Sequence, residues 1–209
     1  MNNMSEFTYE TKNRTNGLET YEWDNVWLDH PYDDEAVRIL YIGDSISCGT
    51  RTVASEATGR KMIFDGFGTS KALDNPYFKD ALHLFALQQA HRDAVLFNNG
   101  LHGWHLSDDT EYAQYYEDFV KFLLSEFPET PLLIVLTTFI KNEADEKRVQ
   151  IRNKVASEIA EKYKLPVVDL YTTAKENADL LIPDGVHFSP EGYQKLAATV
   201  IDAVKNELK

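Results

Sequence analysis

The stretch "VRILYIGDSISCG", residues 37–49, begins as an apolar run and ends in a turn followed by small polar residues. A continuous run of aliphatic and aromatic residues is typical of a strand that is buried on both faces of a parallel sheet. Gly43 and Asp44 favour a turn, after which the chain can begin a helix. Open α/β sheets bind their ligands at the carboxyl ends of the strands, so Ser45 is expected at the functional edge of the sheet.

The rest of the chain repeats this alternation of apolar runs and longer segments of helical period. The other apolar runs are residues 61–66, 94–99, 132–138 and 165–170. Segments with apolar residues at helical spacing are residues 77–91, 110–127, 143–164 and 189–208. This order predicts an α/β fold with a five-stranded parallel sheet and helices on both faces. We expect one domain, residues 37–209, and an N-terminal extension, residues 1–36, whose Trp23 and Trp27 pack on the sheet rim or, alternatively, bind ligand.

Composition excludes several classes of partner. The chain has 209 residues, with 34 acidic and 21 basic side chains and a formal net charge of -13. A strongly negative molecule repels phosphate backbones and anionic lipid surfaces, so neither a nucleic acid nor a membrane is an expected partner. The first residues lack the pattern of an export signal, which predicts a cytoplasmic protein unless a signal has been removed. Cys48 is the single cysteine, so no internal disulfide can form.

Three residues could form a nucleophilic site. Ser45 is a poor nucleophile at neutral pH unless a base accepts its proton, and that base is usually a histidine oriented by a carboxylate. The segment "IPDGVHFSP", residues 182–190, offers His187 as the base and Asp184 three residues earlier as its partner. The same segment could instead be a turn before a helix that is capped by Ser189. Because the chain supplies a nucleophile, a base and a carboxylate together, we predict a catalytic triad of Ser45, Asp184 and His187.

Acyl transfer also requires hydrogen-bond donors for the oxygen that becomes negative. The candidate donors are the amide of Ser45, the amide of Gly68 after the second run, and the side-chain amide of Asn98 after the third. Gly66 is the alternative to Gly68, and Asn99 is the alternative to Asn98.

Four blocks of the sequence together resemble the SGNH, or GDSL-type, hydrolase family. They are "GDS" at 43–45, a glycine near residue 68, "NNGLHG" at 98–103 and "DGVH" at 184–187. The third block departs from the family pattern, in which a glycine and an aspartate are more common around the asparagine. The resemblance implies a three-layer α/β/α sandwich of flavodoxin-like type, a serine nucleophile, an oxyanion hole of Ser45, Gly68 and Asn98, and no cofactor.

Residues around the third block have more than one interpretation. His102 and Trp104 could contact substrate, and Trp104 could equally pack in the core. His102, His105, Asp108 and Asp109 also have the chemistry of zinc ligands, but their spacing does not favour a metal site, and we expect none. Asp44 is expected to accept hydrogen bonds from backbone amides beside Ser45, and Cys48 to be a small buried residue.

The predicted function is that of a serine esterase acting through an acyl-enzyme. The resemblance is closest to carbohydrate O-acetyl esterases, so acetyl groups on a small molecule or an oligosaccharide are the expected substrate. A lysophospholipase or thioesterase, an acyl transferase, and a glycan-binding relative without activity are the alternatives.

Overall fold

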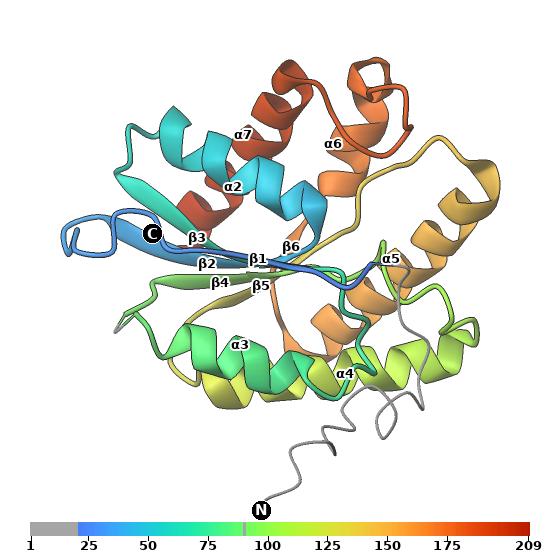
Figure 1. The fold of residues 1–209 in the computed structure, drawn as a ribbon, viewed down its shortest axis with the longest axis horizontal. Coiled ribbons are helices and arrows are strands. Elements are labelled where there is room, and N and C mark those ends of the chain that lie inside the picture. The colour runs from blue at the N-terminus through green and yellow to red at the C-terminus, as the bar shows by residue number, and fades with distance from the viewer. Residues whose placement is uncertain (1–20, 90) are drawn as a thin grey trace, which may run out of the picture.

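A six-stranded sheet forms the centre of the computed structural model, which describes residues 21–89 and 91–209 (Figure 1). The strands lie in the order β1-β3-β2-β4-β5-β6. Their bounds are Asp24–Trp27 for β1, Val37–Gly43 for β2, Met62–Thr69 for β3, Ala94–Phe97 for β4, Leu132–Val135 for β5 and Val167–Val168 for β6. All neighbouring pairs are parallel except β1 and β3, which are antiparallel.

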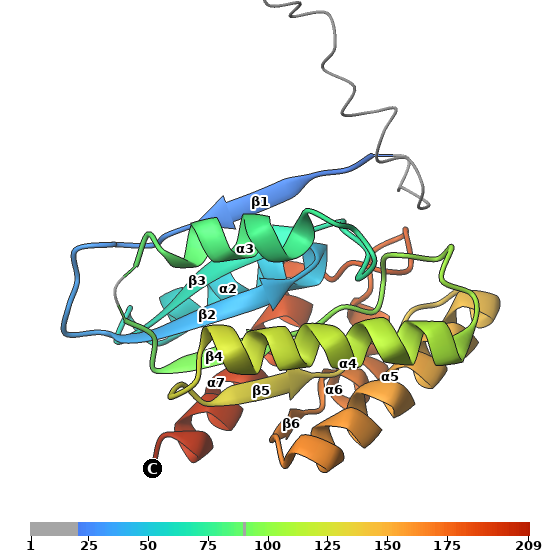
Figure 2. The ribbon, with the colours of Figure 1, turned by 90° about the horizontal axis from the view of Figure 1, so that it is seen from below.

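Helices cover both faces of the sheet. They are α2 (Ser45–Ala57), α3 (Phe78–Ala86), α4 (Asp109–Glu126), α5 (Glu143–Tyr163), α6 (Leu170–Glu176), a 3₁₀ turn at Ala178–Leu180, and α7 (Pro190–Glu207). Figures 1 and 2 show α2, α6 and α7 on one face and α3, α4 and α5 on the other. Within the described residues, no helix is both long and apolar enough to cross a bilayer.

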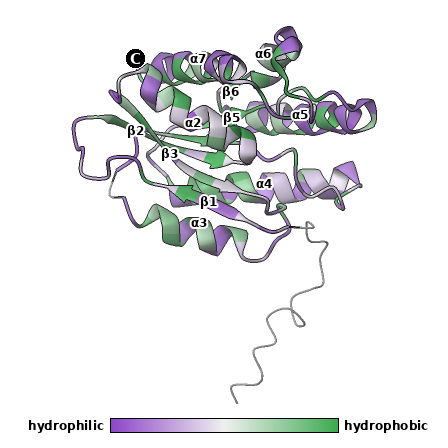
Figure 3. Ribbon diagram, turned by 45° about the horizontal axis from the view of Figure 1, so that its top comes forward, coloured by the Kyte–Doolittle hydropathy of each residue, from purple (hydrophilic) through white to green (hydrophobic). Residues whose placement is uncertain are grey.

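Alternation along the strands divides the core into two layers. In β2, Ile39 and Tyr41 belong to the cluster that packs with α2 and α7, whereas Leu40 and Ile42 belong to the cluster with α3 and α4. Successive side chains of a strand point to opposite faces, so both faces of a central strand must be apolar. Hydrophobic colour accordingly concentrates in the strands and hydrophilic colour on the outer sides of the helices (Figure 3).

The predicted α/β architecture is confirmed, but the predicted number of strands is wrong. The sixth strand, β1, belongs to the N-terminal extension and pairs with β3 from Asp24↔Thr69 to Trp27↔Gly66. All its residues are exposed. An edge strand that lacks a covering helix carries no apolar run, and therefore the hydrophobic pattern does not reveal it. Residues 1–20 of the predicted extension lie outside the described residues.

A buried ion pair anchors the connection between β1 and β2. Arg38 of β2 and Asp65 of β3 are almost fully buried, and their side chains are 2.8 Å apart. Arg38 also donates to the carbonyl oxygens of Asp29 and His30, and the Asp29 amide donates to Asp65. A buried charge must be paired and hydrogen-bonded to be tolerated, and this network meets both conditions.

Helix α2 packs unusually closely on its neighbours because glycine lies at the contacts. A Cβ atom at Gly49 would lie 2.4 Å from the ring of Tyr193 in α7. One at Gly66 of β3 would lie 1.7 Å from the guanidinium of Arg51. Both distances are shorter than any van der Waals contact, so a larger residue at either position would force the Tyr193 ring or the Arg51 side chain to move.

We expect Gly49→Ala to destabilise the protein by about 1–3 kcal/mol, because the added methyl overpacks the contact with Tyr193. In a Tyr193→Ala background the ring is gone, and Gly49→Ala should instead stabilise, because alanine favours a helix over glycine by about 1 kcal/mol. Urea unfolding of the four proteins of this cycle tests the change of sign. The same cost in both backgrounds would contradict the packing argument.

Candidate active site

The structure brings Ser45, Asp184 and His187 together from opposite ends of the chain. Ser45 is the first residue of α2, and the other two lie in the turn that precedes α7. The Ser45 Oγ atom is 2.7 Å from Nε2 of His187. The Nδ1 atom of His187 is 2.7 Å from Oδ2 of Asp184. These two distances form a continuous hydrogen-bonded chain from hydroxyl to imidazole to carboxylate.

The carboxylate determines the proton positions in this chain. The backbone amides of Val186 and His187 donate to Oδ1 of Asp184. Together with the His187 side chain, they lower the pKa of Asp184 to about 2. Asp184 is therefore ionised at neutral pH and can only accept, so Nδ1 of His187 carries a proton. Nε2 is then the free acceptor, and the Ser45 hydroxyl donates to it.

The turn that carries Asp184 and His187 is held by its own backbone. The Ile182 amide donates to the carbonyl oxygen of His187, and the Gly185 amide donates to that of Ile182. Gly185 has φ +74°, a conformation that residues with a Cβ rarely adopt. Its carbonyl oxygen accepts from the amide of Lys141, which follows β5. The histidine is thus fixed relative to the sheet and not only to α7.

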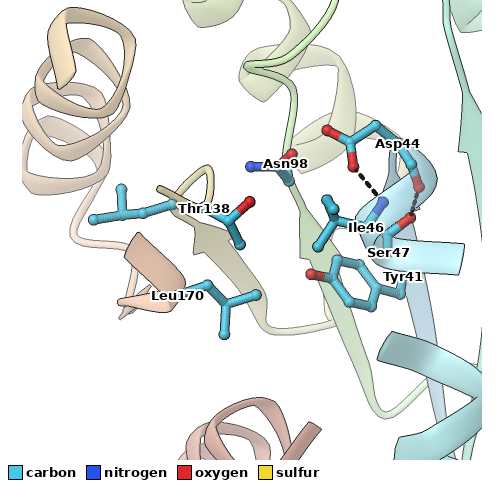
Figure 4. A pocket seen from close by; sticks show the side chains of 8 residues that line it. Tyr41, Asp44, Ile46, Ser47, Asn98, Thr138 and Leu170 are labelled. Carbon is cyan, nitrogen blue, oxygen red and sulfur yellow. Dashed lines mark hydrogen bonds between the residues drawn. The ribbon is translucent and has the colours of Figure 1, made fainter. Parts of the chain in front are cut away.

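Asp44 closes the turn before Ser45, as the sequence predicted. Its Oδ1 accepts from the amide of Ile46 at 2.9 Å, and its carbonyl oxygen accepts from the hydroxyl of Ser47 (Figure 4). The second carboxylate oxygen and the hydroxyl of Thr138 are buried without a protein partner. Both residues line one cavity of about 10 Å³. That volume is close to the minimum for one water molecule.

Asn98 lies at the end of β4 beside this cavity, but its side-chain amide is already engaged. Nδ2 donates to the carbonyl oxygen of Val135 at 2.8 Å and to the hydroxyl of Thr137 at 3.0 Å. An amide nitrogen has two hydrogens, so both are used. To donate to an oxyanion at Ser45, Asn98 must give up one of these bonds. The alternative, Asn99, donates through Nδ2 to the carbonyl oxygen of Lys71.

The expected place of Gly68 after its strand is wrong. The sequence suggested a strand that ends at residue 66, whereas β3 continues to Thr69, because β2 pairs with it as far as Gly68 and β1 as far as Thr69. A Cβ atom at Gly68 would lie 2.2 Å from Sγ of Cys48 and 3.5 Å from the carbonyl oxygen of Asp44. Gly68 therefore borders the turn before Ser45, whereas Gly66 lies two residues earlier in β3, under Arg51. Of the two glycines, Gly68 is the one beside Ser45.

The residues proposed to contact substrate or metal have other partners. Trp104 has the guanidinium groups of Arg148 and Arg152 each 4.7 Å from its ring, and packs against the core. His102 packs edge-on against Trp23. His105 pairs with Asp74 at 3.0 Å. Across residues 21–89 and 91–209, no group of three or more metal-ligating side chains could hold a metal ion.

Two arginines of α5 hold the loop that follows β4, and sequence reasoning missed them. Arg152 is buried and donates to the carbonyl oxygens of Gly100, His102 and Gly103 at 2.7–3.0 Å. Arg148 donates to those of Trp104 and Leu106. In the sequence of a helix rich in charged residues, a buried arginine cannot be distinguished from a solvated one. The helical phase of Arg152, three residues after the buried Val149, is the signal that could have identified it.

The family comparison matches residues 41–195 to the model of the GDSL-like lipase/acylhydrolase family. That range contains Ser45, Asn98, Asp184 and His187 and covers most of the chain. The chain belongs to the GDSL-like lipase/acylhydrolase family. It is accordingly an ester hydrolase, as its sequence predicted. No curated protein matches the chain in sequence.

Solved structures of this family share the fold of the chain. A lipase/acylhydrolase from Enterococcus faecalis is 20% identical with a TM-score of 0.64, and the match covers 83% of this chain and 97% of that one. An acetyl xylan esterase is 19% identical with a TM-score of 0.61, and the match covers 80% of this chain and 100% of that one. An aryl esterase from M. smegmatis is 16% identical with a TM-score of 0.62, and the match covers 82% of this chain and 99% of that one. At such identities the likeness establishes the fold alone.

The carboxyl pKa of Asp184 should remain below its ordinary value of 3.8 in a His187→Ala variant, because backbone amides are the largest cause of its depression. ¹³C NMR titration of the carboxyl carbon measures it. In the wild type we expect a value of about 2. A depressed folded pKa stabilises the protein above the unfolded pKa of about 3.9, and this contribution is lost as the pH falls toward 2. A return to 3.8 in His187→Ala would show that the imidazole alone lowers it.

Arg152→Met should loosen the loop of residues 98–106, because three carbonyl oxygens lose their donor. We expect the variant to lose about 2–4 kcal/mol of unfolding free energy, since each buried carbonyl left unpaired costs about 1–3 kcal/mol and the loop relaxes in part. Amide hydrogen exchange in this loop should accelerate. Lys154→Met, on an exposed face of the same helix, should change neither the unfolding free energy nor the exchange rate. Unaltered exchange in Arg152→Met would contradict the role of Arg152.

Proposed function

We propose that the protein hydrolyses short-chain esters through an acyl-enzyme formed on Ser45. The observation that carries this proposal is the hydrogen-bonded chain from Ser45 through His187 to Asp184. A hydroxyl that already donates to an imidazole can transfer its proton as it attacks a carbonyl carbon. Asp184 then stabilises the imidazolium that forms.

The proposed reaction has two stages. Ser45 Oγ bonds to the ester carbonyl carbon while its proton passes to Nε2 of His187. The bond to the alcohol oxygen breaks, and the alcohol leaves with that proton. A water molecule then gives a proton to His187 and attacks the acyl carbon, which releases the acid and restores the Ser45 hydroxyl.

The oxyanion donors are proposed in order of their support. Ser45 opens α2, and the first amides of a helix have no acceptor within it. The Ser45 amide is therefore the first donor. Gly68 borders the same turn and is the second, and because it lies within β3 between β1 and β2 its amide must turn out of the sheet to donate. Asn98 is the third, and it must exchange its bond to Val135 or Thr137 for one to the oxyanion.

The proposed substrates are acetyl esters of carbohydrates. Two solved structures that share the fold, at 19% and 14% identity, carry the names acetyl xylan esterase and acetyl esterase. The cavity beside the turn of Asp44 holds only about 10 Å³, and its lining mixes polar Asp44, Asn98 and Thr138 with apolar side chains such as Ile46 and Leu170. It offers no room for a long acyl chain, which needs a larger apolar pocket.

Hydrolysis of p-nitrophenyl acetate tests the nucleophile and the base. We expect Ser45→Ala and His187→Ala to lower kcat by about 10³-fold or more, because the members of a catalytic triad act together and each variant removes one of them. Cys48→Ala and His105→Ala are the controls, and both should keep the kcat of the wild type. Cys48 is a thiol one helical turn from Ser45, and His105 is a histidine that pairs with Asp74. Activity of Ser45→Ala within a few-fold of the wild type would refute the mechanism.

The acyl chain length separates the proposed substrate class from the lipid alternative. The wild type should hydrolyse p-nitrophenyl acetate with a higher kcat/KM than the octanoate ester. A steep rise from acetate to octanoate would instead favour a lysophospholipase or thioesterase.

A further inference from the structure

A groove of about 450 Å³ runs between α2 and the edge strand β1. Asn25 and Trp27 of β1 lie opposite Gly68 and Gly66 of β3. Directly opposed residues of an antiparallel pair point to the same face, here the face that carries α2. The side chains of Arg51 and Cys48 lie over these two glycines and fill the space that a side chain there would take. The lining includes Asn25, Trp27, Asp29, Arg51, Glu56 and Arg60.

Trp27 is the prominent apolar group of this groove. Trp27 is 60% exposed. A tryptophan in a small protein usually buries its ring, because burial of such an area is strongly favourable. An exposed indole within a concave surface offers a flat apolar face beside polar groups. That combination suits a ligand that has an apolar face and polar edges.

The charges that line the groove balance one another. Arg60 pairs with Asp29 at 3.2 Å, and Arg51 donates to the side chain and the carbonyl oxygen of Asn25. Glu56 adds the second negative charge. The groove thus holds two positive and two negative side chains. An uncharged ligand that is rich in hydroxyl groups matches this lining, whereas an acyl chain would desolvate the charges without replacing their hydrogen bonds.

The groove begins one helical turn from Ser45 along α2. Cys48, three residues after Ser45, lines it, and the Cys48 Sγ atom lies over Gly68. Trp27 lies opposite Gly66, two residues or about 7 Å of strand below Gly68. A ligand that extends from Ser45 along α2 would therefore reach the indole within a few sugar units.

We propose that this groove binds an uncharged oligosaccharide, the alcohol part of the ester substrate, with a sugar ring stacked on Trp27. The proposal rests on the proposed function and deepens it. It names the surface that selects the substrate, whereas the triad determines only the reaction.

Steady-state kinetics on two substrates test this role. For acetylated xylo-oligosaccharides, Trp27→Ala should raise KM about tenfold with kcat within twofold, because it removes binding shared by the ground and transition states. Trp27→Phe should recover part of the loss. For p-nitrophenyl acetate, which is too short to reach the groove, none of these variants should differ from the wild type. Val26→Ala is the matched control, since Val26 lies on the same strand opposite Phe67, on the other face.

Calorimetric binding separates the groove from the chemistry. Ser45→Ala and Ser45→Ala/Trp27→Ala are titrated with xylohexaose, cellohexaose and mannohexaose, none of which carries an ester. Binding of at least one of them to Ser45→Ala, weakened tenfold or more by Trp27→Ala, supports the groove even if the wild type proves inactive on acetylated sugars. Binding of none, or binding that Trp27→Ala leaves unchanged, overturns it even if the triad is catalytic.

Discussion

The close packing of α2 against β3 and α7 is the constraint on which the site depends. Ser45 begins α2 and His187 precedes α7, so their separation is set by how these two helices meet. At Gly49 the helix backbone approaches the ring of Tyr193 more closely than any larger residue would allow. The Ser45 hydroxyl then lies 2.7 Å from the imidazole. Two side chains so far apart in sequence are brought within hydrogen-bond distance by a contact that involves neither of them.

Residues after the strands could be located from the sequence because parallel strands end at one edge. The apolar run of residues 37–43 matches β2 residue for residue, and the helix of residues 143–164 differs from α5 by a single residue. Ser45, Asp184 and His187 follow from this arrangement, because a long-range site needs only correct strand ends. The turn chemistry of Asp44 and the Ser189 cap were predictable for the same reason, since both are local.

Features that depend on specific tertiary partners could not be predicted. The strand β1 has no apolar pattern, because it is exposed on both faces and is specified by pairing with β3. Pairing with both β1 and β2 carries β3 past residue 66 and places Gly68 within a strand. The burial of Arg38 with Asp65 and of Arg152 under the loop after β4 likewise depends on neighbours that are distant in sequence. A charged side chain in a helix or strand gives no sign of its own that it is buried.

One turn of α5 supports the backbone on both sides of Asn98, the third of the proposed oxyanion donors. Arg152 holds the carbonyl oxygens of the loop that follows Asn98. Its neighbour Asn153 exchanges two hydrogen bonds with the backbone of Thr137, at 2.7 and 2.8 Å. Thr137 in turn accepts from the Asn98 side chain. Because the bonds of Arg152 and Asn153 involve only backbone atoms of the loop and of Thr137, a rotation of the Asn98 side chain toward Ser45 would break its own hydrogen bonds and leave those of α5 in place.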